Sequence, residues 1–322
     1  MTIIKTPTSP VLESIEPVVR QSQHVKIDQE RLEKLTETLA QDLEETRGSH
    51  WSTDCPINLQ GLDHDQRLAF LFVFNAISFS YWGEPKWSIP YQGKTFERGT
   101  WSMIAALHRA VEEGTPLLDP GYLTNIEDEQ LEQILRGNTI IPLLSERTTI
   151  LCEVGRTVQE RYQGNFLGVV EASEGDALRL VEVLVDHFPN FQDTAQYGTH
   201  NVHFRKRAQL LVSDLTQMGG YSLGNTDQLT ACADYILPMV LRYHGVLTYS
   251  QELGVKVDSG IELPKGSAEE VEIRAHTIAA VEAMKRTLEN RFTAMQINDA
   301  LWLMGDTIPP TEHHHRTRTT AY

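Results

Sequence analysis

Residues 267–291 read Ser-Ala-Glu-Glu-Val-Glu-Ile-Arg-Ala-His-Thr-Ile-Ala-Ala-Val-Glu-Ala-Met-Lys-Arg-Thr-Leu-Glu-Asn-Arg. A serine followed three residues later by a glutamate, here Ser267 and Glu270, has the form of a capping box at the start of a helix. The stretch therefore predicts the longest helix of the chain, which we expect to end near Arg291.

Similar helix signals recur along the chain, whereas strand signals are sparse. The expected helices run from the box of Asp63 and Gln66 to about Ser80, from Thr100 to Glu113, from the box of Thr124 and Glu127 to Gly137, from Ser145 to about Tyr162, over 175–187 and over 295–304. Strands are expected in a small hairpin, 86–91 with 94–98 around Gln92-Gly93, and in a second one within 197–204.

The pattern of these elements predicts the fold class. Strands do not alternate with helices, so a parallel sheet is not expected. We expect a mainly α protein, with one compact helical domain over residues 11–322 and one or two small β-hairpins. Residues 1–10 and 305–313 are expected to be loose.

Composition narrows the class of partner. The chain has 322 residues and a formal net charge of −16, with 44 acidic and 28 Lys or Arg residues. Proteins that bind intact nucleic acid normally carry a basic stripe, and only two short basic patches occur here, 205–207 and 313–318. A small anionic ligand fits this charge better than a polynucleotide.

The cellular setting is predicted from cysteines and hydropathy. The three cysteines, Cys55, Cys152 and Cys232, lie far apart, which favours a reduced cytoplasmic setting. The first 30 residues lack the apolar core of a signal peptide, and no apolar run reaches the roughly 20 residues that span a bilayer. We therefore expect a cytoplasmic protein without a membrane partner; its oligomeric state is left open.

The segment Leu229-Thr230-Ala231-Cys232-Ala233-Asp234-Tyr235-Ile236-Leu237-Pro238 places one carboxylate in apolar surroundings. Burying a carboxylate costs several kcal/mol unless a charge or a hydrogen-bond donor meets it. Asp234 is therefore either half of a structural ion pair or a working acid, base or cation stabiliser.

Two basic segments are candidate anion sites. Phe204-Arg205-Lys206-Arg207 lies where a strand is expected to give way to a helix, and cations are unfavourable at a helix start unless an anion is near. An anionic ligand or acidic side chains are therefore expected there. The tail residues 315–318, His-Arg-Thr-Arg, form either an anion clamp or a solvated tail. The three histidines at 313–315 are expected to be solvated rather than to bind a metal ion.

One motif suggests a different enzyme class. Residues 220–224, Gly-Tyr-Ser-Leu-Gly, match the nucleophile elbow of serine hydrolases, and Asp234 with His244 or His276 would complete a triad around Ser222. The elbow requires a preceding strand, whereas residues 208–215 are predicted to be helical. A turn between helices is the simpler interpretation.

Several short motifs in one order resemble the queuosine salvage proteins, the queuosine 5′-phosphate N-glycosylase/hydrolase family. The motifs are 78–82 (Ser-Phe-Ser-Tyr-Trp), 91–95 (Tyr-Gln-Gly-Lys-Thr), Trp101-Ser102 with Ala105-Ala106 and Arg109-Ala110, 204–209 (Phe-Arg-Lys-Arg-Ala-Gln), 233–238 (Ala-Asp-Tyr-Ile-Leu-Pro), 270–274 (Glu-Val-Glu-Ile-Arg), Leu301-Trp302 and 315–318. The resemblance runs from about residue 11 to the end. It implies a helical fold related to DNA glycosylases and release of queuine from queuosine 5′-monophosphate for reuse in tRNA.

The resemblance also implies roles for individual residues. Asp234 falls on the family's catalytic or base-binding aspartate, and Cys232 stands where an aromatic usually lies. The final helix motif carries an aspartate four residues before its tryptophan; counting back from Trp302 gives Asn298, with Asp299 next to it, and both stay candidates. His50 corresponds to a histidine in the family's first loop.

The implied reaction suits these residue types. Breaking a ribosyl C1′–N9 bond builds positive charge on the sugar, which Asp234 or Asp299 can stabilise electrostatically or as a nucleophile. A second carboxylate would hold the cationic secondary amine of the base. Phe79, Trp82 and Tyr235 are the expected stacking residues, and the expected phosphate ligands are Lys206, Arg316 and Arg318. No metal or cofactor is expected, and a serine hydrolase or a non-enzymatic nucleobase-binding module are the alternatives.

Overall fold

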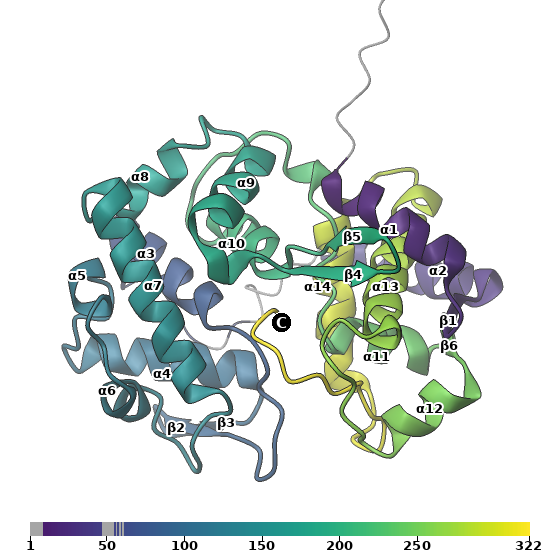
Figure 1. Ribbon diagram of the computed structural model, residues 1–322, viewed down its shortest axis with the longest axis horizontal. Coiled ribbons are helices and arrows are strands. Elements are labelled where there is room, and N and C mark those ends of the chain that lie inside the picture. Colours follow the sequence, from purple (N-terminus) through teal and green to yellow (C-terminus); the bar gives the residue numbers. More distant parts are fainter. Residues whose placement is uncertain (1–8, 47–54, 56, 58, 60) are drawn as a thin grey trace, which may run out of the picture. The chain divides into compact units, whose positions relative to one another are not determined.

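The computed structural model describes residues 9–46, 55, 57, 59 and 61–322. Over these residues it contains 14 α-helices, 56% of the chain is helical, and the strands form only two-stranded sheets (Figure 1). The predicted mainly α fold class is therefore confirmed. The chain divides into two compact units, each of which is described by itself.

Unit 1 comprises 193–206, 225–318 and the described part of the first 53 residues. Its helices are α1 (Pro10–Gln21), α2 (Gln29–Glu45), α11 (Ile236–Tyr243), α12 (Gln251–Asp258), α13 (Ala268–Thr287) and α14 (Ala294–Met304), with short 3-10 turns η3 (Thr226–Gln228) and η4 (Gly305–Thr307). Its strands pair as β1 (Val25–Ile27) with β6 (Leu247–Tyr249) and β4 (Thr194–Tyr197) with β5 (His200–His203), both antiparallel.

Helix α13 is the predicted long helix, and its start is as expected. The side chain of Ser267 accepts a hydrogen bond from the N–H of Glu270. The helix ends at Thr287 rather than near Arg291, because Glu289 and Asn290 have φ values of 53° and 56°. Residues in this left-handed conformation terminate a helix.

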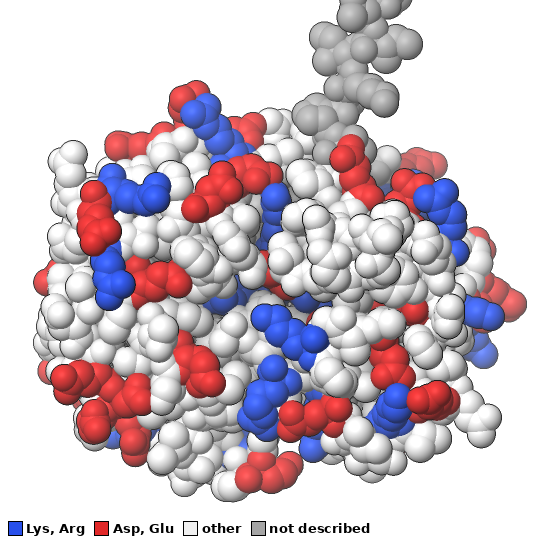
Figure 2. Space-filling model, viewed as in Figure 1, with Lys and Arg blue, Asp and Glu red and all other residues white. Residues whose placement is uncertain are grey.

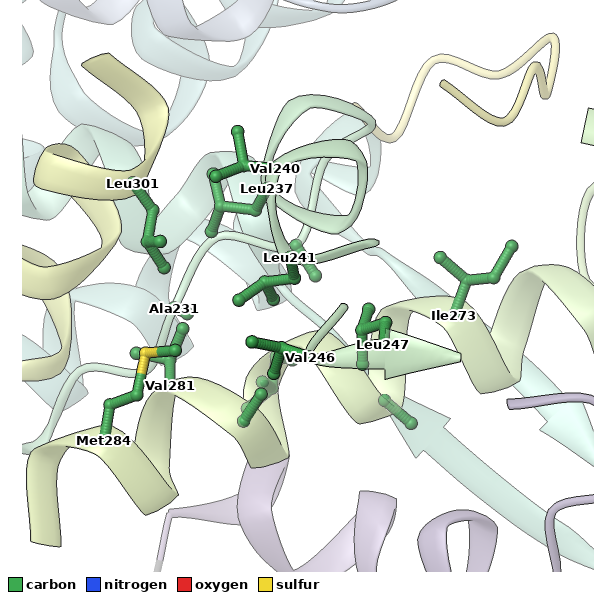
Figure 3. Close-up of a cluster of buried hydrophobic side chains, with 14 of the residues drawn as sticks. Ala231, Leu237, Val240, Leu241, Val246, Leu247, Ile273, Val281, Met284 and Leu301 are labelled. Atoms are coloured by element: carbon green, nitrogen blue, oxygen red, sulfur yellow. The ribbon is translucent and has the colours of Figure 1, made fainter. Parts of the chain in front are cut away.

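The apolar core of unit 1 gathers around α13. Val281, Met284 and Ile273 of this helix belong to one buried apolar cluster with Leu241 of α11 and Leu301 of α14 (Figure 3). Helices α1, α2 and α14 pack against α13, so it is buried on nearly all sides. A helix buried all round must also satisfy the polar side chains it carries.

Glu272 of α13 meets that requirement with backbone donors. Its carboxylate accepts hydrogen bonds from the N–H groups of Gln23, His24 and Val25, at distances between 2.6 and 3.1 Å. The hydroxyl of Tyr197 adds a fourth donor at 2.7 Å. The buried acid thereby joins the α1–β1 connection and strand β4 to α13.

Unit 2 comprises 207–224, 319–322 and the described part of 54–192. Its helices are α3 (His64–Ala76), α4 (Gly99–Glu112), α5 (Pro120–Leu123), α6 (Asp128–Ile134), α7 (Leu144–Tyr162), α8 (Phe166–Glu171), α9 (Ala177–His187) and, after Lys206, α10 (Lys206–Gln217), with the 3-10 turn η2 (Pro189–Phe191). Strands β2 (Ile89–Tyr91) and β3 (Lys94–Phe96) form the predicted hairpin around Gln92-Gly93.

Two buried arginines organise the core of unit 2. Arg147 donates to the carbonyls of Ile77, Phe79 and Pro142, and Arg207 donates to the carbonyl of Ala76. These hydrogen bonds satisfy the backbone carbonyls of the residues that end and follow α3. The chain can therefore leave the helix at Ala76 rather than near Ser80. A buried arginine can satisfy several carbonyls at once because its guanidinium carries five N–H groups.

Several helices begin at other residues than predicted, because neighbouring residues compete for the same capping contacts. Asp63 and Gln66 form the expected capping box, but the box before α6 is made by Glu127 and Gln130 instead of Thr124 and Glu127. Ser145 does not cap α7, because the helix already begins at Leu144, and the Ser145 hydroxyl donates to Asp128 instead. Helix α4 begins one residue before Thr100, at Gly99.

Two features were missed or misjudged from the sequence. Strands β1 and β6 pair across more than 200 residues, which local pattern cannot reveal. The histidines 313–315 were expected to be solvated, and 315–318 to be either an anion clamp or a solvated tail, yet His315 and Thr317 are buried. The solvated alternative is therefore wrong for these two residues. At the end of the chain Tyr322 is buried, and its carbonyl accepts a hydrogen bond from the N–H of Ser80.

The surface reflects the composition. Acidic side chains are scattered over the face shown in Figure 2, with Lys and Arg side chains among them. None of the helices in the described part of the chain combines the length and hydrophobicity needed to cross a bilayer.

We predict that Glu272→Gln lowers the free energy of unfolding by about 2–4 kcal/mol, because the amide replaces one acceptor oxygen by a donor that faces backbone N–H groups. Urea unfolding followed by circular dichroism measures the loss. Glu33→Gln on the exposed face of α2 is the matched control and should stay within about 0.5 kcal/mol of wild type. Equal stability of both variants would contradict the structural role of Glu272.

Candidate functional site

The Asp234 carboxylate lies at the start of α11 in unit 1. Its Oδ1 accepts hydrogen bonds from the N–H groups of Ile236 at 2.8 Å and Leu237 at 3.1 Å. The side chain is largely buried, with 8% of the residue exposed. Since backbone N–H groups at a helix start favour negative charge, this position suits an ionised carboxylate.

Three contacts from other parts of unit 1 hold the backbone just before Asp234. The guanidinium of Arg274 donates from Nε to the Ala233 carbonyl at 3.0 Å. The N–H of Cys232 donates to Asn298 Oδ1 at 2.8 Å, and Cys232 Sγ lies 3.4 Å from the Lys206 carbonyl. Ala231 and Leu237, on either side, point into the apolar cluster of Figure 3. The segment is therefore fixed at both ends.

Asp299 and Asn298 lie on α14, which begins with a capping box between Thr293 and Gln296. Both side chains are buried, with 1% and 4% of the residue exposed. Asn298 Nδ2 donates to Asp299 Oδ1 at 2.9 Å. Through Asn298, the structure thus connects the Asp299 carboxylate to the segment that carries Asp234.

Lys206 begins α10 at the junction that the sequence marked as basic. It is 6% exposed, and its N–H donates to Asp193 Oδ2 at 3.1 Å. Asp193 is the acidic side chain that the junction was expected to require. Within the described residues, no ion pair involves the Lys206 ammonium, so this side chain is a candidate for binding an anion.

Asp193 is itself held by a buried arginine. Arg274 donates to both of its oxygens, at 2.8 and 2.6 Å, and lies 3.6 Å from a Glu270 oxygen. The guanidinium also packs 3.9 Å from the centre of the Phe204 ring. In the sequence, Arg274 belongs to a family motif, but the motif predicted no role for it. Asp193 was not predicted at all, because it lies in no periodic or capping pattern.

The C-terminal residues 313–318 pack onto unit 1. The rings of His314 and Tyr235 are 4.6 Å apart, and burial lowers the pKa of His314. Burial, with the nearby charges of His314 and Arg274, lowers the pKa of His315 to about 3, so this histidine is neutral at pH 7. Among the described residues, no three His, Cys, Asp or Glu side chains are grouped to hold a metal ion.

The two tail arginines differ in their surroundings. The Arg316 carbonyl accepts a hydrogen bond from the Leu263 N–H at 2.7 Å, which anchors its backbone. Arg318 forms an ion pair with Glu262 at 2.9 Å, and both side chains are about half exposed. A surface ion pair of this kind is weak, since water and salt screen it.

The remaining candidates fall outside this group. Phe79 and Trp82 belong to unit 2, where Phe79 is 1% exposed and the guanidinium of Arg147 lies 4.1 Å from its ring centre. That environment favours a packing role for Phe79; stacking by Phe79 and Trp82 stays a prediction. His50 lies outside the described residues.

The nucleophile-elbow interpretation of Ser222 lacks its structural context. Helix α10, not a strand, precedes Gly220, and Gly224 exchanges backbone hydrogen bonds with Gly175 and Ala177. Ser222 lies in the turn between, as the simpler interpretation predicted. Asp234 and His276, its proposed partners, belong to the other unit.

In unit 1, therefore, hydrogen bonds connect the segment of Asp234 and Tyr235 to Asn298, the neighbour of Asp299, and to the backbone of Lys206, although these segments lie far apart in sequence. Carboxylates with hydrogen-bond donors on one side can stabilise a developing cation, and a buried ammonium can hold an anion. Such a set suits a substrate that carries a phosphate and forms a sugar cation. Binding alone would use the same groups, so the geometry does not by itself choose between an enzyme and a binding module.

Comparison with known proteins adds the missing information. The chain is 40% identical to a Sphaerobacter thermophilus protein over 325 residues, which covers 97% of each chain. It is 34% identical to a Mus musculus protein over 88% of this chain and 85% of the other, and 29% identical to a Dictyostelium discoideum protein over 94% and 95%. All three bear the name "Queuosine 5'-phosphate N-glycosylase/hydrolase".

A family model described as "Queuosine salvage protein" matches residues 59–322, which include the whole of α13 and α14 and the segment around Asp234. The match covers most of the chain, and the resemblance found in the short motifs is confirmed by it. The chain belongs to the queuosine salvage protein family.

Proposed function

We propose that this protein hydrolyses the N-glycosidic bond of queuosine 5′-monophosphate and releases queuine. The names of its relatives support this activity, because they are N-glycosylase/hydrolases with identities up to 40% over nearly the whole chain. The observation that carries the proposal is the Asp234 carboxylate, buried in an apolar segment and oriented by the N–H groups of Ile236 and Leu237.

The proposed reaction breaks the bond between C1′ of the ribose and N9 of the base. The bonding electrons leave with the base, and positive charge develops on the sugar. Asp234 or Asp299 stabilises that charge, or forms a covalent intermediate with C1′. Water supplies the hydroxyl that ends on C1′ and the proton that ends on queuine, so no other reactant is needed.

The base imposes a second requirement. In queuine, carbon replaces the purine N7, so an acid cannot assist departure by protonating that position. The carboxylate near the sugar must therefore contribute more of the stabilisation of the transition state. The base also carries a secondary amine that is cationic at neutral pH, and a second carboxylate would hold it. Two aspartates in one unit, Asp234 and Asp299, fit the two tasks of stabilising the sugar cation and holding the amine. Which aspartate performs which task stays open.

The phosphate is proposed to bind Lys206. This side chain is buried, and within the described part of the chain its ammonium has no acidic partner, whereas Arg318 pairs with Glu262. Arg316 is kept as a second phosphate ligand. Tyr235, held against His314, is proposed to stack on the substrate. Stacking by Phe79 and Trp82 of unit 2 is a separate expectation.

Three wider expectations stay part of the proposal. Residues 11–322 would act as one functional domain, and the family match over 59–322 supports this because it runs through both units. The protein would work in the cytoplasm on a small nucleotide rather than on intact nucleic acid. Free queuine detected by chromatography after incubation with queuosine 5′-monophosphate is the direct test of the activity.

We predict that Asp234→Asn folds normally but lowers kcat at least about 100-fold, because asparagine still caps α11 yet brings no charge to the sugar cation. Steady-state release of queuine and a thermal unfolding curve measure both properties. Asp28→Asn at the start of α2 is the matched control, since Asp28 also caps a helix in unit 1. Wild-type turnover by a folded Asp234→Asn protein would refute the role of Asp234.

We predict that Lys206→Gln raises KM for the 5′-monophosphate about tenfold or more and leaves kcat/KM for the free nucleoside within about threefold. A charged contact to phosphate contributes about 1.5–3 kcal/mol, and 1.4 kcal/mol corresponds to one factor of ten. Lys34→Gln on the exposed face of α2 is the control. Equal losses on nucleotide and nucleoside would instead indicate that Lys206 has a structural role.

We predict that dialysis against EDTA leaves turnover unchanged, because the proposed steps use only carboxylates, water and an ammonium. The measurement compares kcat/KM before and after dialysis, and again after a divalent ion is added. Loss of turnover that Zn²⁺ or Mg²⁺ restores would contradict the proposed chemistry.

A further inference from the structure

Asn298 occupies the point where α14 meets the segment that carries Asp234. The oxygen of its amide accepts a hydrogen bond from the Cys232 N–H at 2.8 Å. The nitrogen of the same amide donates to Asp299 Oδ1 at 2.9 Å. The residue is 4% exposed. Both ends of the amide are thus engaged within the protein.

The chemistry of this position selects an amide. The backbone N–H of Cys232 requires an acceptor, and the carboxylate of Asp299 requires a donor. Among small side chains, asparagine offers one of each on a rigid planar group without adding charge. An aspartate here could accept from Cys232 but could not donate to Asp299, and two adjacent carboxylates would repel each other.

The helical setting strengthens this interpretation. Asparagine is a poor residue for the interior of a helix, because its side chain competes for backbone hydrogen bonds. The amide oxygen of Asn298 instead accepts from the N–H of Cys232, outside its own helix. A buried polar side chain at such a position indicates a specific partner rather than tolerance of a surface residue.

We propose that Asn298 is a positioning residue that sets the spacing between the two carboxylates of the site, and not a ligand of the substrate. It fixes Asp299 through its nitrogen and the Cys232–Asp234 segment through its oxygen. This inference rests on the proposed function, since it assigns the two carboxylates to one reaction. Misplacing catalytic groups by about 1 Å can cost up to about 100-fold in rate.

Two substitutions separate the two hydrogen bonds. Asn298→Asp keeps the acceptor for Cys232 and removes the donor to Asp299, whereas Asn298→Ala removes both. The control is Asn165→Asp, which adds the same charge at the exposed N-cap of α8, where aspartate caps equally well. The measurements are kcat and KM on queuosine 5′-monophosphate, thermal unfolding, and hydrogen exchange of the peptide covering 229–237.

We expect Asn298→Asp to lower kcat at least about tenfold with KM changed less than about threefold, and to leave exchange in 229–237 as in wild type. Asn298→Ala should lower kcat further and speed exchange in 229–237, because the Cys232 N–H loses its acceptor. Asn165→Asp should match wild type in every measurement.

The opposite results are equally decisive. Wild-type kcat in Asn298→Asp, or a loss confined to KM, would overturn the positioning role, the second result by indicating contact with the substrate. Unchanged exchange in Asn298→Ala would overturn the connection to Cys232 without any use of activity. If Asn298→Ala does not fold, Asn298→Asp still decides the question. Absence of turnover by the wild type would refute the proposed function instead.

Discussion

The buried ion pair between Arg274 and Asp193 is the interaction on which the arrangement of unit 1 depends. One guanidinium bonds both Asp193 oxygens, lies near Glu270, packs on Phe204 and donates to the Ala233 carbonyl. Asp193 in turn receives the Lys206 N–H. The pair thereby connects α13 to the start of α10 and to the segment of Asp234.

Such a pair is not expected to contribute much net stability, because removing two charges from water costs about as much as their attraction returns. Its effect is on geometry, because the N–H groups of the buried Arg274 require acceptors such as both Asp193 oxygens and the Ala233 carbonyl to lie around it. Asp193 and Glu270 have a structural role, because they share the charge of Arg274. The sequence raised the question of a structural or a functional role for Asp234, and its functional role stays a proposal.

The sequence predicted those elements that local chemistry determines. Local signals act on neighbours within a few residues, so they can be predicted from the sequence alone. Examples are the capping residues Asp63 and Ser267 and the turn at Gln92-Gly93. The β1–β6 pair and the packed tail depend on partners far away in the chain, and no local pattern encodes them. Where two local signals compete, as at Thr124 and Glu127, neighbouring contacts decide: Thr124 ends α5 and its hydroxyl donates to the Pro120 carbonyl, so the box forms at Glu127 and Gln130.

The same distinction applies to the site. Asp234 was recognisable because an apolar segment isolates it, and Lys206 because cations are unusual at a helix start. Asp193 had no such mark, since its role comes from meeting Arg274, 81 residues away. Hydrogen bonds connect 193 to 206, 206 to 232, and 232 to 298, so the residues of the proposed site are held by the same contacts that fix the backbone. Groups held in this way need no rearrangement when charge develops on a substrate, which is the condition under which electrostatic stabilisation accelerates a reaction most.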